Sequence, residues 1–447
     1  MTDHGSGQVM LAPAARRLPF SLLVGSGLVA AAAAAQAPGP LEKSAGAENA
    51  PAAASEPLTT EEAVGLALSN SRQLESLDTM VEIQNYRTHA AGWIDNPELR
   101  VRNLTARSVD RNFDELEIGV RWRPPGPGEA AEERQQDQVR LWERKVEAQR
   151  ARDWLASRVR RACADVIMYR ELVRIASGRV NNETRRIAQI KTMLDLGRRS
   201  IVYYTNAKTM VSEARNDQTR SLQALRDEER RLQRLTGTDA PIDVVFEPLP
   251  EVEGTQEQLL AIAYAHRPEV RLVEARQQLA VRRHERERRR RLPWISFVEV
   301  AHHREQGADD RNELMFGLEL PVFGRNGGQI QAARLGIARK EAQSLAIRER
   351  IEDEVYDTFA VFSEARLAWQ LARDDGEQLI AEASRVIAEA SAHGTVPADE
   401  VLELERAILD TQTMFAERRR EVAHAAYFLY YALGIDRPER AVPAPAF

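Results

Sequence analysis

The sequence contains a single cysteine, Cys163, and aromatic residues make up only 6% of its 447 positions. One cysteine excludes an internal disulfide framework and a cysteine-based zinc site. There is no excess of positive charge, since 62 Lys and Arg face 68 Asp and Glu, a formal net charge of −6. This balance argues against a general nucleic-acid-binding protein, which needs a basic surface. Beyond the N-terminal region no run of 18 apolar residues occurs, so no membrane-spanning helix is predicted there.

Motifs for catalysis and cofactor binding are also missing. The glycine-rich segment 324–328 lacks the Lys-Ser/Thr pair that completes a phosphate-binding loop, and the sequence has no HExxH motif. The adjacent pair His302 and His303 is a weak metal signal, which we interpret as structural. We therefore predict a protein that is not an enzyme and has no cofactor and no metal site.

The N-terminus has the order of an export signal. Arg16 and Arg17 precede an apolar run over 18–35, and the small-x-small sequence Ala35-Gln36-Ala37 follows. This pattern is typical of a signal peptide cleaved after Ala37. The alternative, a helical membrane anchor, is disfavoured because Pro19 and two glycines interrupt the run. Export to an oxidising compartment agrees with the single cysteine.

The sequence of the rest of the chain indicates a tandem duplication of one structural unit. At an offset of 196 residues Leu74 falls on Val270 and Pro97 on Pro293, and at an offset of 198 Gly126 falls on Gly324. The predicted parts are a signal peptide (1–37), a flexible Pro/Ala/Glu-rich leader (38–57), a first repeat (58–240), a linker (241–254), a second repeat (255–436) and a C-terminal tail (437–447).

Each repeat has the pattern of a helix, two strands and a long helical hairpin. Apolar residues alternate with polar ones or glycine over 116–122 and 314–320, which predicts strands with one apolar face. Over 159–180 and 362–390 apolar residues recur at steps of three and four, the seam of a coiled coil. The predicted elements are helices over about 60–92 and 256–290, strands near 98–106, 113–123, 294–302 and 312–322, long helices over about 130–196 and 328–393, and return helices after Gly197 and Gly394.

Strand edges and helix seams both indicate an oligomer. Four strands per chain leave two open edges, which lipid does not tolerate, so neighbouring subunits must supply the missing strands. Narrow apolar seams on long helices likewise need neighbouring helices. We predict a symmetric homo-oligomer with a ring of strands above a ring of helices, mainly α with a β portion.

Three segments carry a family resemblance. The sequence over 58–64, Leu-Thr-Thr-Glu-Glu-Ala-Val, Asn96-Pro97-Glu98-Leu99, and the stretch 320–330, Leu-Pro-Val-Phe-Gly-Arg-Asn-Gly-Gly-Gln-Ile, occur in this order. Together they resemble the TolC-like outer membrane efflux factor family, and the last two resemble its branch serving heavy-metal pumps of the resistance-nodulation-division type. The resemblance covers about 58–436.

The resemblance implies a fold and a function. It implies a homotrimer whose four strands per chain form a twelve-stranded barrel in outer-membrane lipid, with coiled helices forming a periplasmic tunnel. Such a protein is a passive exit duct, joined by a periplasmic adaptor to an inner-membrane pump, and would export metal cations or small toxic compounds. The alternatives are a duct for type I protein or peptide secretion and an exported periplasmic coiled-coil scaffold with no barrel.

The resemblance also assigns roles to two turns and one acidic pair. It makes Gly197, Arg198 and Arg199, together with Gly394 and Thr395, the helical tips that dock the adaptor; without it these are only hairpin turns. It places Glu400 and Glu403 in carboxylate rings at the tunnel throat, which favour cations. The alternative for the pair is an exposed, solvated helix face. At the equivalent sites of the first repeat stand Tyr203 and Asn206, so the acids are not doubled.

The most basic segment is 282–291, which contains seven arginines. Export argues against nucleic-acid binding, and we interpret the segment as a solvated helix end near the membrane boundary, in contact with anionic lipid headgroups. Trp122 and Trp294 lie near strand ends, where aromatic girdles form. Cys163 lies beside the helical seam and is interpreted as a small core residue.

Overall fold

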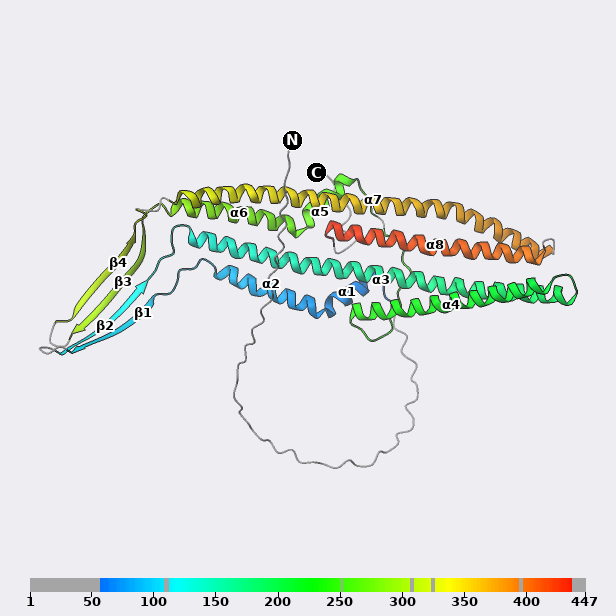
Figure 1. Ribbon diagram of the computed structural model, residues 1–447, viewed down its shortest axis with the longest axis horizontal. Helices are drawn as coiled ribbons and strands as arrows, with labels where there is room; N and C mark the ends of the chain where they lie inside the picture. The colour runs from blue at the N-terminus through cyan, green and yellow to red at the C-terminus, as the bar shows by residue number, and fades with distance from the viewer. Residues whose placement is uncertain are drawn as a thin grey trace, which may run out of the picture. The chain divides into compact units, whose positions relative to one another are not determined.

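The computed structural model describes residues 57–107, 112–250, 252–305, 309–322, 326–393 and 397–435. All described elements belong to one compact unit, Ser55–Phe447. Their order (Figure 1) is α1 Thr60–Asn70, α2 Arg72–Ala90, β1 Glu98–Arg107, β2 Asn112–Trp122, α3 Glu129–Asp195, α4 Ile201–Thr236, α5 Gln256–His266, α6 Pro268–Arg289, β3 Trp294–Glu305, β4 Arg311–Glu319, α7 Gly327–His393 and α8 Ala398–Leu433.

The same order of elements occurs twice along the chain. Both long helices, α3 and α7, have 67 residues, and both return helices, α4 and α8, have 36. The predicted strands and long helices are confirmed to within three residues at each end. The duplication itself stays a prediction, which these equal lengths support.

The opening helix of each half is broken in two, so the prediction of single helices over 60–92 and 256–290 is wrong. Thr59 caps α1 in a capping box with Glu62. Ser71 then ends α1 and caps α2, because its hydroxyl accepts a hydrogen bond from the backbone N–H of Leu74 (3.3 Å). In the second half Arg267 has an extended backbone before Pro268, which opens α6 at its first position.

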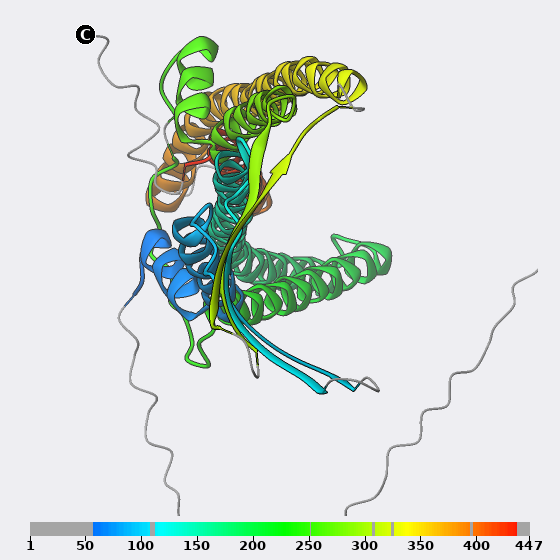
Figure 2. The same cartoon turned by 90° about the vertical axis from the view of Figure 1, so that its left-hand side faces the viewer.

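The four strands form one antiparallel sheet in sequence order, β1-β2-β3-β4. Two hairpins, β1–β2 and β3–β4, are joined by the pairing of β2 with β3, which sets Trp122 opposite Val298. A bulge between Ile295 and Phe297 shifts the register at the start of β3. Figure 2 shows the strands twisting together along their length.

The helices pack around α3 and α7. Helix α3 contacts α1, α2, α4, α6 and α8, and α7 contacts α5, α6 and α8. Figure 1 shows α4 beside α3 and α8 beside α7 as two long hairpins. Because α8 touches both long helices, it links the two halves of the chain.

The predicted seam residues form the core of these hairpins. Val159, Ala162 and Val166 of α3 are fully buried, and Cys163 beside them is buried as well. A second cluster under α5, α7 and α8 includes Phe362 and Leu429. Each large apolar side chain buried in this way contributes about 1.5–3 kcal/mol to stability. Among the described helices, none combines the length and the apolar composition that a membrane crossing requires.

Candidate functional site

The sheet exposes a continuous apolar face. Leu99, Val120, Val300 and Leu314 are paired side by side across all four strands, with exposed fractions of 69, 47, 56 and 68%. Neighbouring rows on this face add Val101, Ile118, Phe316 and Leu318, which are exposed as well. A patch of this kind needs an apolar partner or environment. The predicted alternation of an apolar and a polar face is therefore confirmed.

The opposite face carries ion pairs. Glu299 of β3 is buried, and its carboxylate accepts two hydrogen bonds from Arg100 of β1 (2.9 and 3.2 Å). Arg121 of β2 approaches the same carboxylate at 3.7 Å, and its guanidinium also lies 4.0 Å from the centre of the Phe297 ring. One carboxylate thus connects three strands by charge-assisted contacts.

His303 makes a second link on this charged face. Its Nδ1 lies 2.7 Å from Glu115 of β2 and its Nε2 lies 2.9 Å from Glu313 of β4. The ring of His303 therefore lies between carboxylates from the two strands that flank β3. The two acids occupy opposite ring nitrogens, which is unlike ligands around one metal ion, and within the described ranges no group of three or more His, Cys, Asp or Glu is arranged to hold a metal. His302, the next residue along β3, points to the apolar face of the sheet, where it contacts Asn312.

The first helical tip is a tight glycine turn. Gly197 has φ +69°, its N–H donates to the carbonyl of Leu194 (2.9 Å), and the N–H of Arg198 donates to the carbonyl of Met193 (2.7 Å). A positive φ suits glycine, and this bonding pattern is a common way to end a helix. Residues 196–200 are all exposed. The tip therefore presents an open surface.

Arg199 connects this tip to the start of α8. Its guanidinium lies 4.0 Å from the carboxylate of Asp399 and 5.0 Å from the centre of the Tyr203 ring. Of the predicted second tip, Gly394 and Thr395 lie outside the described residues. The first tip therefore lies beside the start of α8, which follows the predicted second tip in the sequence.

Glu400 and Glu403 lie in the first turns of α8, and both side chains are exposed. Three residues apart, they share one face of the helix. Leu402 between them is buried, and its carbonyl accepts a hydrogen bond from Asn182 of α3 (3.0 Å). Within the described part of the chain neither carboxylate has an ion-pair partner. Tyr203 is likewise exposed on α4.

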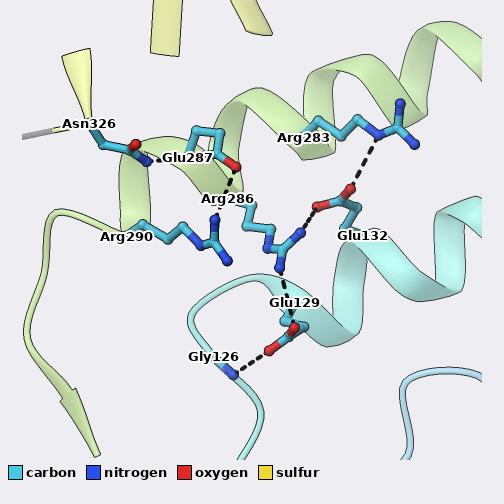
Figure 3. Close-up of polar contacts among 8 residues, drawn as sticks. All are labelled: Gly126, Glu129, Glu132, Arg283, Arg286, Glu287, Arg290 and Asn326. Atoms are coloured by element: carbon cyan, nitrogen blue, oxygen red, sulfur yellow. Dashed lines mark hydrogen bonds and ion pairs between the residues drawn. The ribbon is translucent and has the colours of Figure 1, made fainter. Parts of the chain in front are cut away.

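The basic run 282–291 is only partly solvated (Figure 3). Arg286 of α6 reaches across to α3, where it binds Glu132 (2.9 Å) and Glu129 (3.2 Å), and Arg283 also binds Glu132 (3.2 Å). The predicted solvated helix end is therefore wrong for Arg286, whose side chain is only 23% exposed. Glu129 and Glu132, in the first turn of α3, are the residues in the sequence that could have indicated this pairing.

Sequence reasoning missed a charged cluster in the middle of the helices. Asp165 of α3 is buried, and its carboxylate accepts a hydrogen bond from Arg420 of α8 (2.5 Å). Nε2 of His424 on α8 lies 2.9 Å from the same carboxylate, and Arg231 of α4 lies 3.9 Å away. Burial alone would raise the pKa of this carboxyl, but the interactions with His424 and Arg420 outweigh it and hold the pKa below its ordinary value. The cluster fastens three helices together.

No protein-family model and no curated protein sequence matches the chain. Solved structures match its fold. CusC, a protein that forms a transmembrane channel, matches with a TM-score of 0.68 and 15% identity, over 84% of this chain and 92% of that one. The outer membrane protein VceC of Vibrio cholerae matches with a TM-score of 0.64 and 14% identity, over 84 and 96%.

The CmeC outer membrane channel of Campylobacter jejuni matches with a TM-score of 0.63 and 12% identity, over 84% of this chain and 85% of that one. The chain therefore shares its fold with outer membrane channels, as the resemblance to the TolC-like family predicts. The heavy-metal branch is not distinguished among these structures and stays a prediction.

Proposed function

We propose that this protein is the outer-membrane exit duct of a tripartite efflux system, a passive channel whose energy comes from an inner-membrane pump. The observation that carries the proposal is the exposed apolar row Leu99, Val120, Val300 and Leu314, backed by the charged face around Glu299. Lipid is the environment that covers an apolar sheet face, and a water-filled lumen suits the charged face.

The assembly follows from the edges of the sheet. Among the described residues β1 and β4 each pair on one side only. In a homotrimer, β1 of one chain would pair with β4 of the next, which gives twelve strands and leaves no edge. The helices continue the duct into the periplasm. Residues 1–37 would direct export, 38–57 would be a leader, and 241–254 would link the two repeats, with 437–447 as a tail.

The proposed partners and cargo are based on the two helical tips and on the acidic residues of the proposed tunnel throat. The turn at Gly197, Arg198 and Arg199, with Gly394 and Thr395, would dock the periplasmic adaptor that joins the duct to its pump. Glu400 and Glu403 would form two rings of three carboxylates, which favour cations. Metal cations or small toxic compounds are therefore the proposed cargo. The shared fold with CusC supports a transmembrane channel.

The test is to extract the protein from outer membranes in mild detergent and to measure its protein mass by light scattering. Three chains per particle would support the duct. A water-soluble monomer or dimer in the periplasmic fraction would overturn it, and the long hairpins would then be a periplasmic scaffold. A gene for an ABC exporter beside this one, in place of a proton-driven pump, would favour protein or peptide secretion.

A further inference from the structure

Four consecutive arginines, Arg288 to Arg291, end α6 directly before β3; we call them the terminal arginine cluster. All four side chains are exposed. Within the described residues Arg288, Arg289 and Arg291 have no side-chain ion pair or hydrogen bond, and Arg290 has only a contact of 3.6 Å with Glu287. Positive charge is therefore concentrated at this point, and three of the four side chains have no bound carboxylate among the described residues.

Two carboxylates at the start of α3 are already engaged by other groups. Glu132 and Glu129 bind Arg283 and Arg286, and Glu129 also accepts a hydrogen bond from the N–H of Gly126 (2.9 Å). Figure 3 shows these contacts on the side of α6 that faces α3.

Two further acids lie within the basic run itself. Glu285 binds Arg282 (2.9 Å), and Glu287 accepts a hydrogen bond from Asn326 (2.6 Å) besides its contact with Arg290. Within the run, Arg283 and Arg286 bind α6 to α3, and Arg282 binds an acid of its own helix. Arg288, Arg289 and Arg291 are left available for an external anion.

The terminal arginine cluster lies at the end of the apolar sheet face. Ile295 of β3 is paired with Leu318 of β4, and both are about half exposed. Leu292, between the cluster and β3, is 60% exposed, and Leu320 and Val322 after β4 are exposed as well. A lipid layer that covers the apolar face would therefore bring its headgroups to the level of the arginines.

Aromatic side chains gather at the same level. A groove of about 630 Å³ is lined by Trp93, Trp294, Arg123 and Arg290, and acidic residues such as Glu133 and Glu319 line it as well. Trp93 itself is 77% exposed. Tryptophan prefers the boundary between hydrocarbon and water, because its ring is apolar and its N–H is polar.

We propose that the terminal arginine cluster binds the phosphate headgroups of anionic phospholipids in the leaflet nearer the helices, and so fixes the depth of the sheet in the membrane. This inference rests on the proposed function. The partner is identified by charge complementarity and by continuity with the apolar face. Each arginine near an anionic surface should change lipid preference by roughly fivefold.

The experiment uses the full chain, reconstituted into vesicles of phosphatidylcholine and phosphatidylglycerol in equal amounts and then extracted in mild detergent. Mass spectrometry measures the ratio of the two lipids retained. The variant carrying Arg288→Gln, Arg289→Gln and Arg291→Gln should lose the preference for phosphatidylglycerol by on the order of a hundredfold at low salt. The variant carrying Arg288→Lys, Arg289→Lys and Arg291→Lys should keep most of this lipid preference, because it keeps the positive charge.

A matched control carries Arg215→Gln, Arg226→Gln and Arg234→Gln on α4. These arginines are exposed and lack side-chain partners in the described structure, and the variant loses the same charge. It should retain lipid like the unmodified protein. Rising salt should weaken the preference of the unmodified protein, because ions screen exposed charges.

Three outcomes overturn this inference without overturning the proposed function. In the first, the unmodified protein inserts but retains the two lipids equally. In the second, the variant with glutamine at positions 288, 289 and 291 retains the same lipid ratio as the unmodified protein. In either case the proposed function stands. Alternatively, light scattering finds monomers for the glutamine triple and trimers for the α4 control, which would mean that the arginines bind a neighbouring subunit. Failure of the unmodified protein to insert into any vesicle would overturn the proposed function itself, and this inference with it.

Discussion

Gly376 of α7 lies directly against the ring of Phe415 of α8: a Cβ on this glycine would be 2.6 Å from Cζ of the phenylalanine. The same Cβ would lie 2.8 Å from Cγ2 of Thr411. The ring is held in place from the side by Trp369, whose centroid is 5.6 Å away at an interplanar angle of 75°. The close approach of α8 explains why glycine occupies a helix interior, where it costs about 1 kcal/mol relative to alanine.

Gly376→Ala should destabilise the α7–α8 hairpin by about 1–3 kcal/mol, because the added methyl group overpacks a rigid contact. Gly336→Ala in the same helix is the matched control, since a Cβ there meets nothing within 4 Å. It should stabilise the protein by up to about 1 kcal/mol. Thermal unfolding in detergent, followed by circular dichroism, measures both. Shifts of the same sign would contradict the assignment of Gly376.

The Asp165 cluster predicts an acid-dependent loss of stability. The folded state holds the pKa of this carboxyl below its ordinary value near 3.9, so the cluster stabilises the protein above that pH. Its contribution is lost as the pH falls through the folded pKa. Asp165→Asn should remove about 1.5–3 kcal/mol at neutral pH, because hydrogen bonds to a charged group are lost.

The measurement is the melting temperature between about pH 7 and pH 3, a window set by the ordinary aspartate pKa. The decline toward acid should be shallower for Asp165→Asn than for the unmodified protein. Asp227→Asn is the control, because Asp227 forms only an exposed pair with Arg230. A decline equally steep in all three proteins would show that Asp165 does not control it.

Cys163 should resist thiol reagents in the folded protein. It is fully buried, and burial, with smaller contributions from Glu247 and Glu61, raises the pKa of its thiol to about 12. The thiolate, which is the reactive form, is therefore scarce. A maleimide at pH 8 should label it only after denaturant is added, as mass spectrometry would report. Rapid labelling of the native protein would mean that α3 opens around this position.

Replacing Glu400 and Glu403 with glutamine should reduce cation selectivity. Both carboxylates are exposed on one helix face, where a narrow lumen would concentrate their field. Reversal potentials in planar bilayers under a salt gradient measure the selectivity. Glu417→Gln, an exposed acid farther along α8, is the control and should change little. Unchanged selectivity in the double variant would remove the pair from the throat.

The elements were predictable because each has a strong local pattern. Alternation over 116–122 and 314–320 predicted strands, and the seam beginning at Val159 predicted helices that the structure confirms. The breaks at Ser71 and Arg267 were missed because the apolar spacing continues through them. There the capping hydroxyl and Pro268 decide the backbone.

Contacts between distant segments were not predictable from local patterns. Nothing near Asp165 in the sequence identifies Arg420 and His424 as its partners, since they lie on α8. The pairing of Arg286 with Glu132 depends in the same way on how α6 lies against α3. The predicted acidic pair did prove exposed, and its position in a lumen stays a prediction.

The strand order β1-β2-β3-β4 has a kinetic consequence. Each hairpin joins segments that are close in sequence and needs only a short loop to close. The pairing of β2 with β3 sets Trp122 opposite Val298, and helices α3 to α6 lie between them in the sequence. Closing so long a loop is slow unless the intervening chain has already folded. We therefore expect the α3–α4 hairpin to form before the two strand pairs meet. Formation of this helical hairpin would then limit the rate at which the sheet is completed.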